Sequence, residues 1–548
     1  MNSQPTAPKR HCLSRVLSAA GVLDVLPSVS DEHWRHLSRI LFAVLAIIAL
    51  WTFRDYGPTW DEDVQRVYGN GVIAFYTSFF RDHSSFEFKN LYLYGGFFDL
   101  IAQAATRISP LDLYETRHLV NAAFAIAGVV GTHRLGRLLG GERTGFFAAL
   151  FVALIPEWYG HGFNNPKDIP FATLHVWALS AIVVSAREVP RVSRRTIALT
   201  GVAIGLALAI RVGGAFLLGY LGIAWGTALL ASWWSRADVD RRRELAGVAI
   251  RGLAAAAIAY AVMLAFWPWA LWSPFVRPLH AALETTHFAW PGPLFFDGQE
   301  FFPKDVPRRY LPVWFSITLP EYVFVGLGAG AALALGRVRR LTLGPRAQEI
   351  GLVAFSILFP IAVAIAVHAN VYDANRHFIF VLPSIAVLCA VVADRLAASR
   401  NIAARLALGA ILASILLTIL DLANLHPYQS VYFNRSIAGG LPRASQRFET
   451  DYYAQTYREG VQWVFRFYKA PPGEKTRIAG CDADFLVDHW IQSDPAAKAR
   501  FEFAGIDDAN VLVTTTRHDC YRRGKILHTI ERKGVPLLYV IELRAPRS

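Results

Sequence analysis

Repeated apolar runs of membrane length are the feature that most constrains this chain. A helix needs about 20 mainly apolar residues to cross a bilayer, and its backbone polar groups must pair within the segment. The 548-residue chain is 54% hydrophobic and only 18% charged. We therefore predict an α-helical polytopic membrane protein with about 11 transmembrane helices. They cover residues 37–53, 118–133, 145–160, 170–186, 196–211, 213–234, 246–270, 320–336, 349–367, 378–394 and 403–423.

Arginines gather in five short loops between these runs. Cytoplasmic loops of membrane proteins carry an excess of Lys and Arg, so we place all five loops on the cytoplasmic side. The net charge of +13 then reports orientation in the membrane, and we expect no nucleic-acid partner. The arginines are Arg134, Arg137 and Arg143; Arg187, Arg191, Arg194 and Arg195; Arg236 and Arg241 to Arg243; Arg337, Arg339, Arg340 and Arg346; and Arg395, Arg400 and Arg405.

The fairly apolar stretch 91–108 conflicts with this orientation. If it crossed the membrane, every later loop would change sides and the arginine-rich loops would lie outside. We therefore predict an interfacial or re-entrant helix within the first outer loop. Its interruptions suit a helix at the surface; they are Gly95, Gly96, Asp99 and Gln103.

The charge pattern divides the chain into three parts. Residues 1–36 form a cytoplasmic tail, which is no cleavable signal because no small-residue cleavage site follows the first apolar run. Residues 37–424 form the membrane domain, with long outer loops at 54–117 and 271–319. Residues 425–548 form a C-terminal extracytoplasmic α/β domain. In that domain we expect strands at 511–514 and 537–541 and a helix at 460–468.

The C-terminal domain contains two of the four cysteines, Cys481 and Cys520. They would pair if the domain faces an oxidising compartment. Two free thiols are equally compatible with the sequence.

An acidic triplet, Asp61-Glu62-Asp63, stands where the chain has just left the first apolar run. A carboxylate at this place can take the proton from an acceptor hydroxyl as that hydroxyl attacks a sugar carbon, and we assign this catalytic role to Asp61. Thr59-x-x-Glu62 also matches a capping box, which would give Glu62 a structural role. A substrate contact and helix capping both stay open for Glu62.

A second polar motif, Gly160 to Pro170, links two apolar runs on the outer side. Asn-Pro marks a turn, and Asp168 is placed to cap the following helix. The density of polar residues also suits a binding site, in which Lys167 meets a phosphate and an asparagine orients a sugar. The candidate substrate-binding residues are His161, Asn165, Lys167 and Asp168.

Two more motifs stand at outer helix ends. Arg211 precedes two glycines and either contacts a phosphate or snorkels to the interface. The segment Tyr372 to Phe378 supplies Asp373, Arg376 and His377, which suit a phosphate leaving group because guanidinium binds phosphate bidentately; an interfacial anchor is the alternative. The aromatic stretch 287–293 suits either a lid over a substrate or membrane anchoring.

The ordered set of these motifs resembles bacterial GT-C glycosyltransferases of the dolichyl-phosphate-mannose–protein mannosyltransferase type, which include aminoarabinose lipid A transferases. The resemblance covers most of residues 37–460. It rests on Asp61-Glu62, the turn from His161 to Asp168, Arg211-Val-Gly-Gly, Tyr372-Asp373 with Arg376-His377, His426-Pro427-Tyr428-Gln429 and Tyr432-Phe433-Asn434.

The resemblance implies a chemistry. In that family the acid of the first outer loop is the proposed catalytic base, which corresponds to Asp61 here. The donor is a polyprenyl-phosphate sugar, and the transfer usually inverts the configuration at the anomeric carbon. No metal or other cofactor is generally needed. One element differs, because Tyr94 to Asp99 replaces the usual His-Pro-Pro-Leu-like sequence, and this leaves the acceptor open. The residues that the resemblance assigns to the lipid phosphate are Lys167, Arg211, Arg376 and His377.

These observations predict a glycosyltransferase of the bacterial inner membrane. It would move a sugar from a polyprenyl-phosphate carrier to an extracytoplasmic glycolipid, polysaccharide or protein. One alternative is a secondary transporter or lipid flippase, in which ionisable groups cluster near the bilayer midplane and internal repeats are common. Another alternative is a non-enzymatic scaffold whose C-terminal domain binds an envelope partner.

Overall fold

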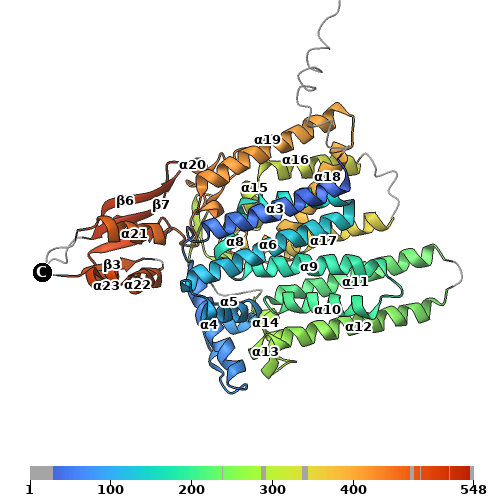
Figure 1. The fold of residues 1–548 in the computed structure, drawn as a ribbon, viewed down its shortest axis with the longest axis horizontal. Coiled ribbons are helices and arrows are strands. Elements are labelled where there is room, and N and C mark those ends of the chain that lie inside the picture. The colour runs from blue at the N-terminus through green and yellow to red at the C-terminus, as the bar shows by residue number, and fades with distance from the viewer. Residues whose placement is uncertain are drawn as a thin grey trace, which may run out of the picture.

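The computed structural model shows a helical bundle with a small sheet domain at one end (Figure 1). It describes residues 29–236, 239–285, 290, 292–335, 344–469, 474–481, 483–517 and 519–543. Most of the predicted tail 1–36 lies outside the described residues. So do Arg337, Arg339 and Arg340, and most of the aromatic stretch 287–293.

Among the described residues, eight helical segments are long and apolar enough to cross a membrane, or up to ten segments if two bent helix pairs are counted. The pairs are α7 (Glu142–Ala153) with α8 (Pro156–Asn164), bent by 67°, and α15 (Tyr310–Thr318) with α16 (Glu321–Leu335), bent by 110°. The polytopic helical fold is therefore confirmed. Six of the eight segments are single α-helices: α3 (Asp31–Thr52), α6 (Leu113–Gly140), α9 (Asp168–Arg187), α12 (Arg241–Ala265), α17 (Pro345–Ala366) and α19 (Ile402–Leu425). The other two begin with a 3₁₀ helix: η4 (Val212–Ala215) leads into α11 (Phe216–Trp234), and η8 (Arg376–Val381) leads into α18 (Leu382–Ala397).

The remaining predicted span, 196–211, forms the shorter helix α10 (Arg194–Leu208). Its 15 residues extend about 22 Å at 1.5 Å per residue, less than the bilayer core. It nevertheless returns the chain to the end where α9 begins. Arg211, which follows α10, lies 2.6 Å from Asp168, the first residue of α9.

Residues 91–108 do not form a span. They contain a short 3₁₀ helix, η3 (Leu91–Leu93), and the 12-residue α5 (Phe97–Ile108), which packs on α4 (Trp60–Thr77) and α6. Other short elements also cover this end of the bundle. They are η2 (Ser84–Phe86), α13 (Pro268–Trp272), α14 (Arg277–Glu284), η6 (Pro303–Asp305) and the hairpin of β1 (Leu294–Phe296) and β2 (Gln299–Phe301).

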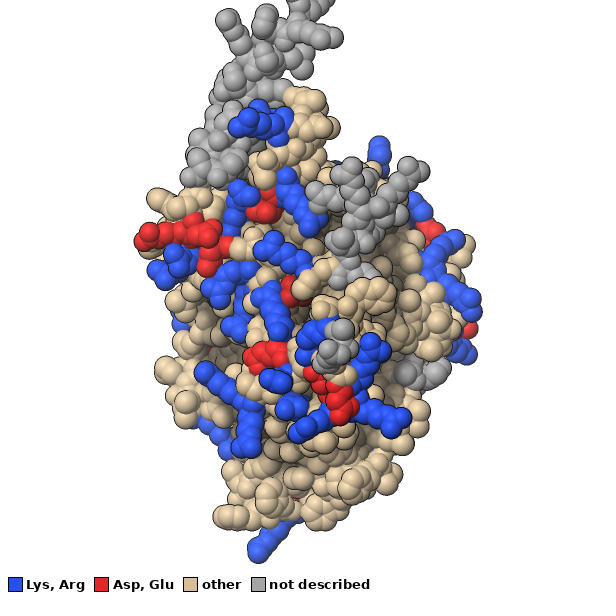
Figure 2. Space-filling model, turned by 90° about the vertical axis from the view of Figure 1, so that its right-hand side faces the viewer, with Lys and Arg blue, Asp and Glu red and all other residues tan. Residues whose placement is uncertain are grey.

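The described arginines of the predicted cytoplasmic loops gather at the opposite end of the bundle. Figure 2 shows this end, on which blue Lys and Arg side chains are dense. Ion pairs tie the helix ends together there: Arg143 lies 2.6 Å from Asp394, and Arg187 lies 2.6 Å from Glu349. The bundle therefore has one strongly basic end and one end that carries the sheet domain.

The sheet domain has five strands in the order β4-β3-β5-β7-β6. β3 runs parallel to β4 and β5, and β7 runs antiparallel to β5 and β6. The predicted helix and both predicted strands are present as α21, β5 and β7. The elements are α21 (Tyr457–Phe467), β3 (Thr476–Gly480), α22 (Asp484–Ser493), α23 (Pro495–Arg500), β4 (Phe501–Phe503), η10 (Ile506–Asp508), β5 (Val511–Thr515), η11 (Asp519–Arg523), β6 (Gly524–Arg532) and β7 (Val535–Leu543).

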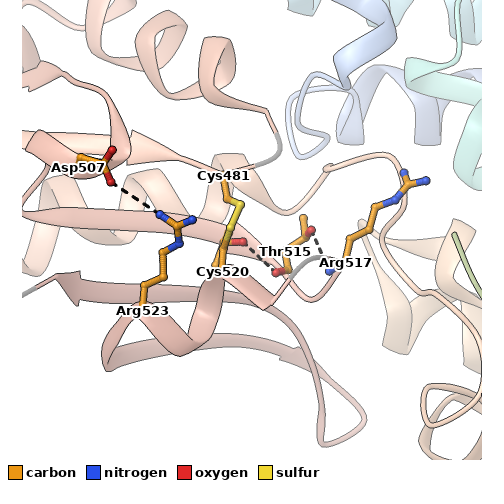
Figure 3. The surroundings of a disulfide bond; sticks show 7 residues. Cys481, Asp507, Thr515, Arg517, Cys520 and Arg523 are labelled. Atoms are coloured by element: carbon orange, nitrogen blue, oxygen red, sulfur yellow. Dashed lines mark hydrogen bonds and ion pairs between the residues drawn. A yellow bond between two sulfur atoms is a disulfide. The ribbon is translucent and has the colours of Figure 1, made fainter. Parts of the chain in front are cut away.

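Cys481 and Cys520 form a disulfide, which joins the end of β3 to η11 (Figure 3). Of the two possibilities left open by the sequence, the structure shows the paired one.

The segment between α19 and α21 includes η9 (Gln429–Val431) and α20 (Leu441–Ala444). It is tied to the bundle: the Asn434 amide donates to the carbonyl of Leu319 (2.9 Å), and the backbone N–H of Gly298 donates to Arg447 (2.9 Å).

The two ends of the bundle should face opposite sides of the membrane. In a variant whose Cys12 and Cys389 are serine, Asp507→Cys should react with an impermeant maleimide in intact spheroplasts, because both the residue and its domain lie at the end away from the arginines. Arg191→Cys, at the exposed basic end, should react only after lysis. Labelling of both positions from the same side would contradict this topology.

Candidate active site

A buried arginine, Arg376, joins three sequence motifs at the end of the bundle that carries the sheet domain. It begins η8 (Arg376–Val381), which leads into α18, and only 3% of its surface is exposed. Its guanidinium donates to Asp373 (2.9 and 3.1 Å), to Asp61 (3.1 Å) and to Asp168 (3.4 Å). The structure thus brings together residues that lie more than 300 positions apart. Because an arginine stays protonated in proteins, the guanidinium of Arg376 places a permanent positive charge among these three carboxylates.

Asp61 lies in the first turn of α4 and is the most accessible of these three carboxylates, with 20% of its side chain exposed. Its Oδ2 accepts a hydrogen bond from the Tyr453 hydroxyl (2.9 Å) and lies 3.6 Å from the Lys167 ammonium. Burial alone would raise the pKa of Asp61. Lys167, Arg376 and the Tyr453 hydroxyl outweigh that effect and lower the pKa well below its ordinary value. The carboxylate is therefore ionised and held by cations.

Glu62 has different partners from Asp61. Its Oε2 accepts from the backbone N–H of Thr59 (3.1 Å) and lies 3.1 Å from His118 Nε2, and 1% of the residue is exposed. The first of these contacts is the carboxylate half of a capping box. In this structure the carboxylate of Glu62 serves to start α4 and to hold it against α6.

A second charged pair lies beside the first. Arg211 Nη2 is 2.6 Å from Asp168 Oδ1, and both Lys167 and Arg211 lie over the ring of Tyr94, at 4.9 and 5.7 Å from its centroid. The face of an aromatic ring attracts cations. Tyr94 therefore forms an aromatic support beneath two of the four residues that the family resemblance assigns to the lipid phosphate.

Gly95 explains how Tyr94 reaches this place. A Cβ atom at Gly95 would meet the carbonyl oxygen of Ala209 at 2.0 Å, so only glycine permits the close approach. Backbone hydrogen bonds then fasten this segment to the ends of α10 and α12: Gly95 N–H donates to Ile210 (3.2 Å), and Gly96 N–H donates to Phe266 (2.9 Å).

Asp99, at the end of the same segment, is buried behind Lys167. It lies 3.6 Å from Arg117, and burial raises its pKa to about 7, although Arg117 and Lys167 oppose the rise. Gln65 bridges Asp99 and Lys167 when its side-chain amide is oriented so that the nitrogen donates to Asp99 (2.7 Å) and the oxygen accepts from the Lys167 ammonium (3.3 Å). The sequence motifs did not single out Gln65 or Arg117.

His161 and Asn165 are buried and hold other site residues in place. The Asn165 amide donates to Asp168 Oδ2 (2.8 Å) and lies 3.2 Å from His161 Nδ1. The other ring nitrogen of His161 lies 2.9 Å from the Tyr452 hydroxyl. The turn predicted from Asn-Pro thus fixes Asp168 on one side and the tyrosines on the other.

A cavity of about 380 Å³ opens next to these charges. Arg211, His377 and Tyr94 line its polar end. Apolar side chains of α11, η8 and α17 line the rest, among them Phe216, Phe380 and Val363. The shape and chemistry suit a molecule with a hydrocarbon chain and an anionic head. A larger cavity of about 1110 Å³ lies at the basic end of the bundle, beside Arg187 and Glu349, and is remote from the motifs.

The sheet domain also contributes to the site through Arg517. Arg517 follows β5 and points away from the sheet toward the bundle (Figure 3). Its Nη2 lies 2.9 Å from Asp373, and its guanidinium lies 5.2 Å from the centroid of the Trp60 ring. Neither Arg517 nor Tyr453 belongs to a motif that the sequence marked, and Arg517 lies in the C-terminal domain, to which the family resemblance does not extend.

Comparison with known proteins finds similarity only among solved structures. No protein-family model matches the chain, and no curated protein matches it. ArnT from Cupriavidus metallidurans bound to undecaprenyl phosphate is 14% identical with a TM-score of 0.45, and the match covers 92% of this chain and 98% of that one.

Two further structures are similar over most of this chain. For the archaeal oligosaccharyltransferase AglB from Archaeoglobus fulgidus, solved with an inhibitory peptide and a dolichol-phosphate, identity is 14%, the TM-score 0.45 and coverage 88% and 69%. The arabinofuranosyltransferase AftD from Mycobacteria is 14% identical with a TM-score of 0.39, and the match covers 93% of this chain and 40% of that one. With TM-scores below 0.5, the function has to be argued from the residues of the site.

Replacement of Glu62 tests its structural role. Glu62→Ala removes the acceptor of the Thr59 N–H and the partner of His118, and loss of such buried bonds costs roughly 1–3 kcal/mol. We expect a lower melting temperature in detergent and a smaller decrease for Glu62→Gln. Glu115→Ala, on a half-buried acid paired with Arg54, is the matched control. A melting temperature of Glu62→Ala equal to that of the wild type would contradict the structural role.

Proposed function

We propose that this protein is an integral membrane glycosyltransferase that moves a sugar from a polyprenyl-phosphate donor to an acceptor outside the cytoplasm. The observation that carries the proposal is the position of Asp61. This partly accessible carboxylate stands among Lys167, Arg211 and Arg376, beside an apolar cavity that ends in basic side chains. A base, an anion site and a place for a hydrocarbon chain are therefore adjacent.

The donor is inferred from the cavity. Its apolar walls on α11 and α17 suit prenyl units, and its polar end presents Arg211 and His377 to a phosphate. Arginine binds phosphate through two parallel hydrogen bonds. Lys167 is the loosest of the cations, at 3.6 Å from Asp61, and is the most readily turned toward the donor.

The reaction follows from these positions. The Asp61 carboxylate accepts the proton of an acceptor hydroxyl while the hydroxyl oxygen forms a bond to C1 of the donor sugar. The bond between C1 and the phosphate oxygen breaks, and its electron pair leaves with the polyprenyl phosphate. Lys167, Arg211 and Arg376 stabilise the charge that develops on that leaving group. Attack on the face opposite the phosphate inverts the anomeric centre.

Donor binding also adjusts the base. Without substrate, cations hold Asp61 ionised and lower its pKa, which makes it a weak proton acceptor. A phosphate that engages Lys167 and Arg376 offsets their charge and raises the proton affinity of Asp61. The base is then strongest when a donor is present. The leaving group is a phosphate monoester, which two or three basic side chains can neutralise, so we propose that the reaction needs no metal.

The proposed location follows from the charges at the two ends of the bundle. The basic end faces the cytoplasm of a bacterium, and the active site and the C-terminal domain face the periplasm, at the inner membrane. Residues 1–36 then form a cytoplasmic tail, 37–424 the transferase domain and 425–548 the periplasmic domain.

Asp61→Asn should abolish sugar transfer and sugar release from a panel of radiolabelled polyprenyl-phosphate sugars, because the amide cannot take a proton. Undecaprenyl phosphate should still bind, since the cations remain. Asp63→Asn is the matched control: it lies in the same turn but pairs with Arg66 and Tyr114, and it should keep its activity. Activity of Asp61→Asn near that of the wild type would remove Asp61 from the mechanism.

Arg211→Ala should weaken binding of undecaprenyl phosphate about tenfold or more, because a hydrogen bond to a charged group contributes roughly 1.5–3 kcal/mol. Arg211→Lys should recover part of the affinity. Arg81→Ala, on an exposed arginine of the same outer region, is the control and should bind normally. A scintillation proximity assay with labelled undecaprenyl phosphate measures the lipid affinity of the wild type and of the three variants. Equal affinity of Arg211→Ala and the wild type would place the phosphate elsewhere.

A further inference from the structure

A second cavity, of about 340 Å³, lies where the sheet domain meets the bundle. Four parts of the chain line it. The β1–β2 hairpin contributes Phe295 and Glu300, the loop after β5 contributes Arg517, and β7 contributes Tyr539. The fourth part is the segment from Ser445 to Tyr452. The proposed reaction assigns no role to this cavity.

Glu449 is the unusual member of the lining. Only 6% of it is exposed, yet neither carboxylate oxygen has a well-formed hydrogen bond among the described residues. Among the described residues, Arg517 Nε lies 3.6 Å from Glu449 Oε2. The neighbouring Asp451 differs, because it accepts from the Thr456 hydroxyl (2.6 Å) and from two backbone N–H groups. The backbone N–H of Phe295 and the Arg517 guanidinium are the donors beside Glu449, and burial nevertheless raises the pKa of this carboxyl to about 7. A buried carboxylate with so few donors costs free energy, and a ligand that brings O–H groups would lower that cost.

The other walls of this cavity suit the same kind of ligand. Phe448, Tyr452 and Tyr539 provide aromatic surface, while Thr450 and Thr516 provide hydroxyl groups. Carboxylates accept hydrogen bonds, hydroxyls donate and accept them, and aromatic rings pack on apolar C–H surface. Carbohydrates present both O–H groups and C–H surface.

The charge of the lining selects against an anion. Four acidic residues, Glu300, Glu449, Asp451 and Asp519, line the cavity against one basic residue, Arg517, among the described residues. That arginine is already paired with Asp373. A phosphate would meet repulsion here, whereas the cavity beside Arg211 attracts it.

Two contacts connect this cavity to the base. Arg517 lies over the ring of Trp60, which directly precedes Asp61. Tyr452 directly precedes Tyr453, whose hydroxyl donates to Asp61. A group bound in the cavity therefore lies next to the residues that hold Asp61.

We infer that this cavity binds a neutral, polyhydroxylated group, the carbohydrate part of the acceptor, with Glu449 accepting hydrogen bonds from its hydroxyls. The assignment to an acceptor rests on the proposed glycosyltransferase activity. Donor and acceptor then approach Asp61 from two sides, the lipid through the apolar cavity and the carbohydrate through the sheet domain.

Saturation-transfer NMR on the full-length protein in nanodiscs tests the cavity directly. The probes are the methyl glycosides of β-glucose, β-galactose and α-mannose, with glucose 6-phosphate as the anionic comparison. At least one glycoside should show saturation transfer, and glucose 6-phosphate should show at least threefold less. The isosteric Glu449→Gln and the wall variant Tyr539→Ala should each lower the glycoside signal at least threefold.

Asp507→Asn, an exposed acid of the same domain, is the control and should leave the signal unchanged. Absence of glycoside saturation, or a signal that neither cavity variant lowers, overturns the inference. Undecaprenyl phosphate binding is measured on the same samples and tests the donor separately. If the lipid binds and the glycosides do not, only the assignment of a carbohydrate to this cavity is rejected. Glycoside binding without lipid binding keeps the carbohydrate site and rejects the proposed transferase.

Discussion

The buried guanidinium of Arg376 is the charge on which the arrangement of this end of the bundle depends. Taking an arginine out of water costs several kcal/mol, and the cost is recovered only if carboxylates and hydrogen-bond acceptors surround the group. Asp61, Asp168 and Asp373 supply them. Those carboxylates come from the first turn of α4, the first residue of α9 and the loop before α18. Pairing with one cation therefore holds three distant segments together.

Cations and carboxylates are paired throughout the site. Lys167, Arg211, Arg376 and Arg517 contact Asp61, Asp168 and Asp373, and Tyr453 adds a hydroxyl donor. Such pairing lets a charged cluster tolerate burial. The cluster lies at helix ends, and this placement differs from the midplane sites of secondary transporters. It suits a reaction in which an anionic group arrives, reacts and leaves at the membrane surface.

Local patterns in the sequence predicted much of this structure, and long-range contacts account for the rest. The apolar runs predicted the long helices, and the arginine-rich loops predicted the basic end of the bundle. The Thr59-x-x-Glu62 pattern predicted where α4 begins. Among the expected site residues, Asp61 and Arg376 meet directly. Helix α10 is shorter than the apolar pattern indicated.

The residues that the sequence analysis missed depend on tertiary packing. Tyr453 and Arg517 reach the site only because the segment after α19 and the sheet domain pack on the bundle, which no local periodicity encodes. The sequence shows a glycine at position 95, but it does not show why glycine is required there. The requirement comes from the carbonyl group of Ala209, which lies more than 100 positions later in the chain and leaves no room for a Cβ atom.

The reach of Arg517 has a consequence for biosynthesis. The helices that carry Asp61 and Asp168 are made early, but the partner that completes the Asp373 pair lies in the loop held near the Cys481–Cys520 bridge. A nascent chain that already contains every helix of the bundle still lacks that side chain until the sheet domain has folded and docked. The charged cluster around Asp373 is thus completed last, by the part of the chain that is made last.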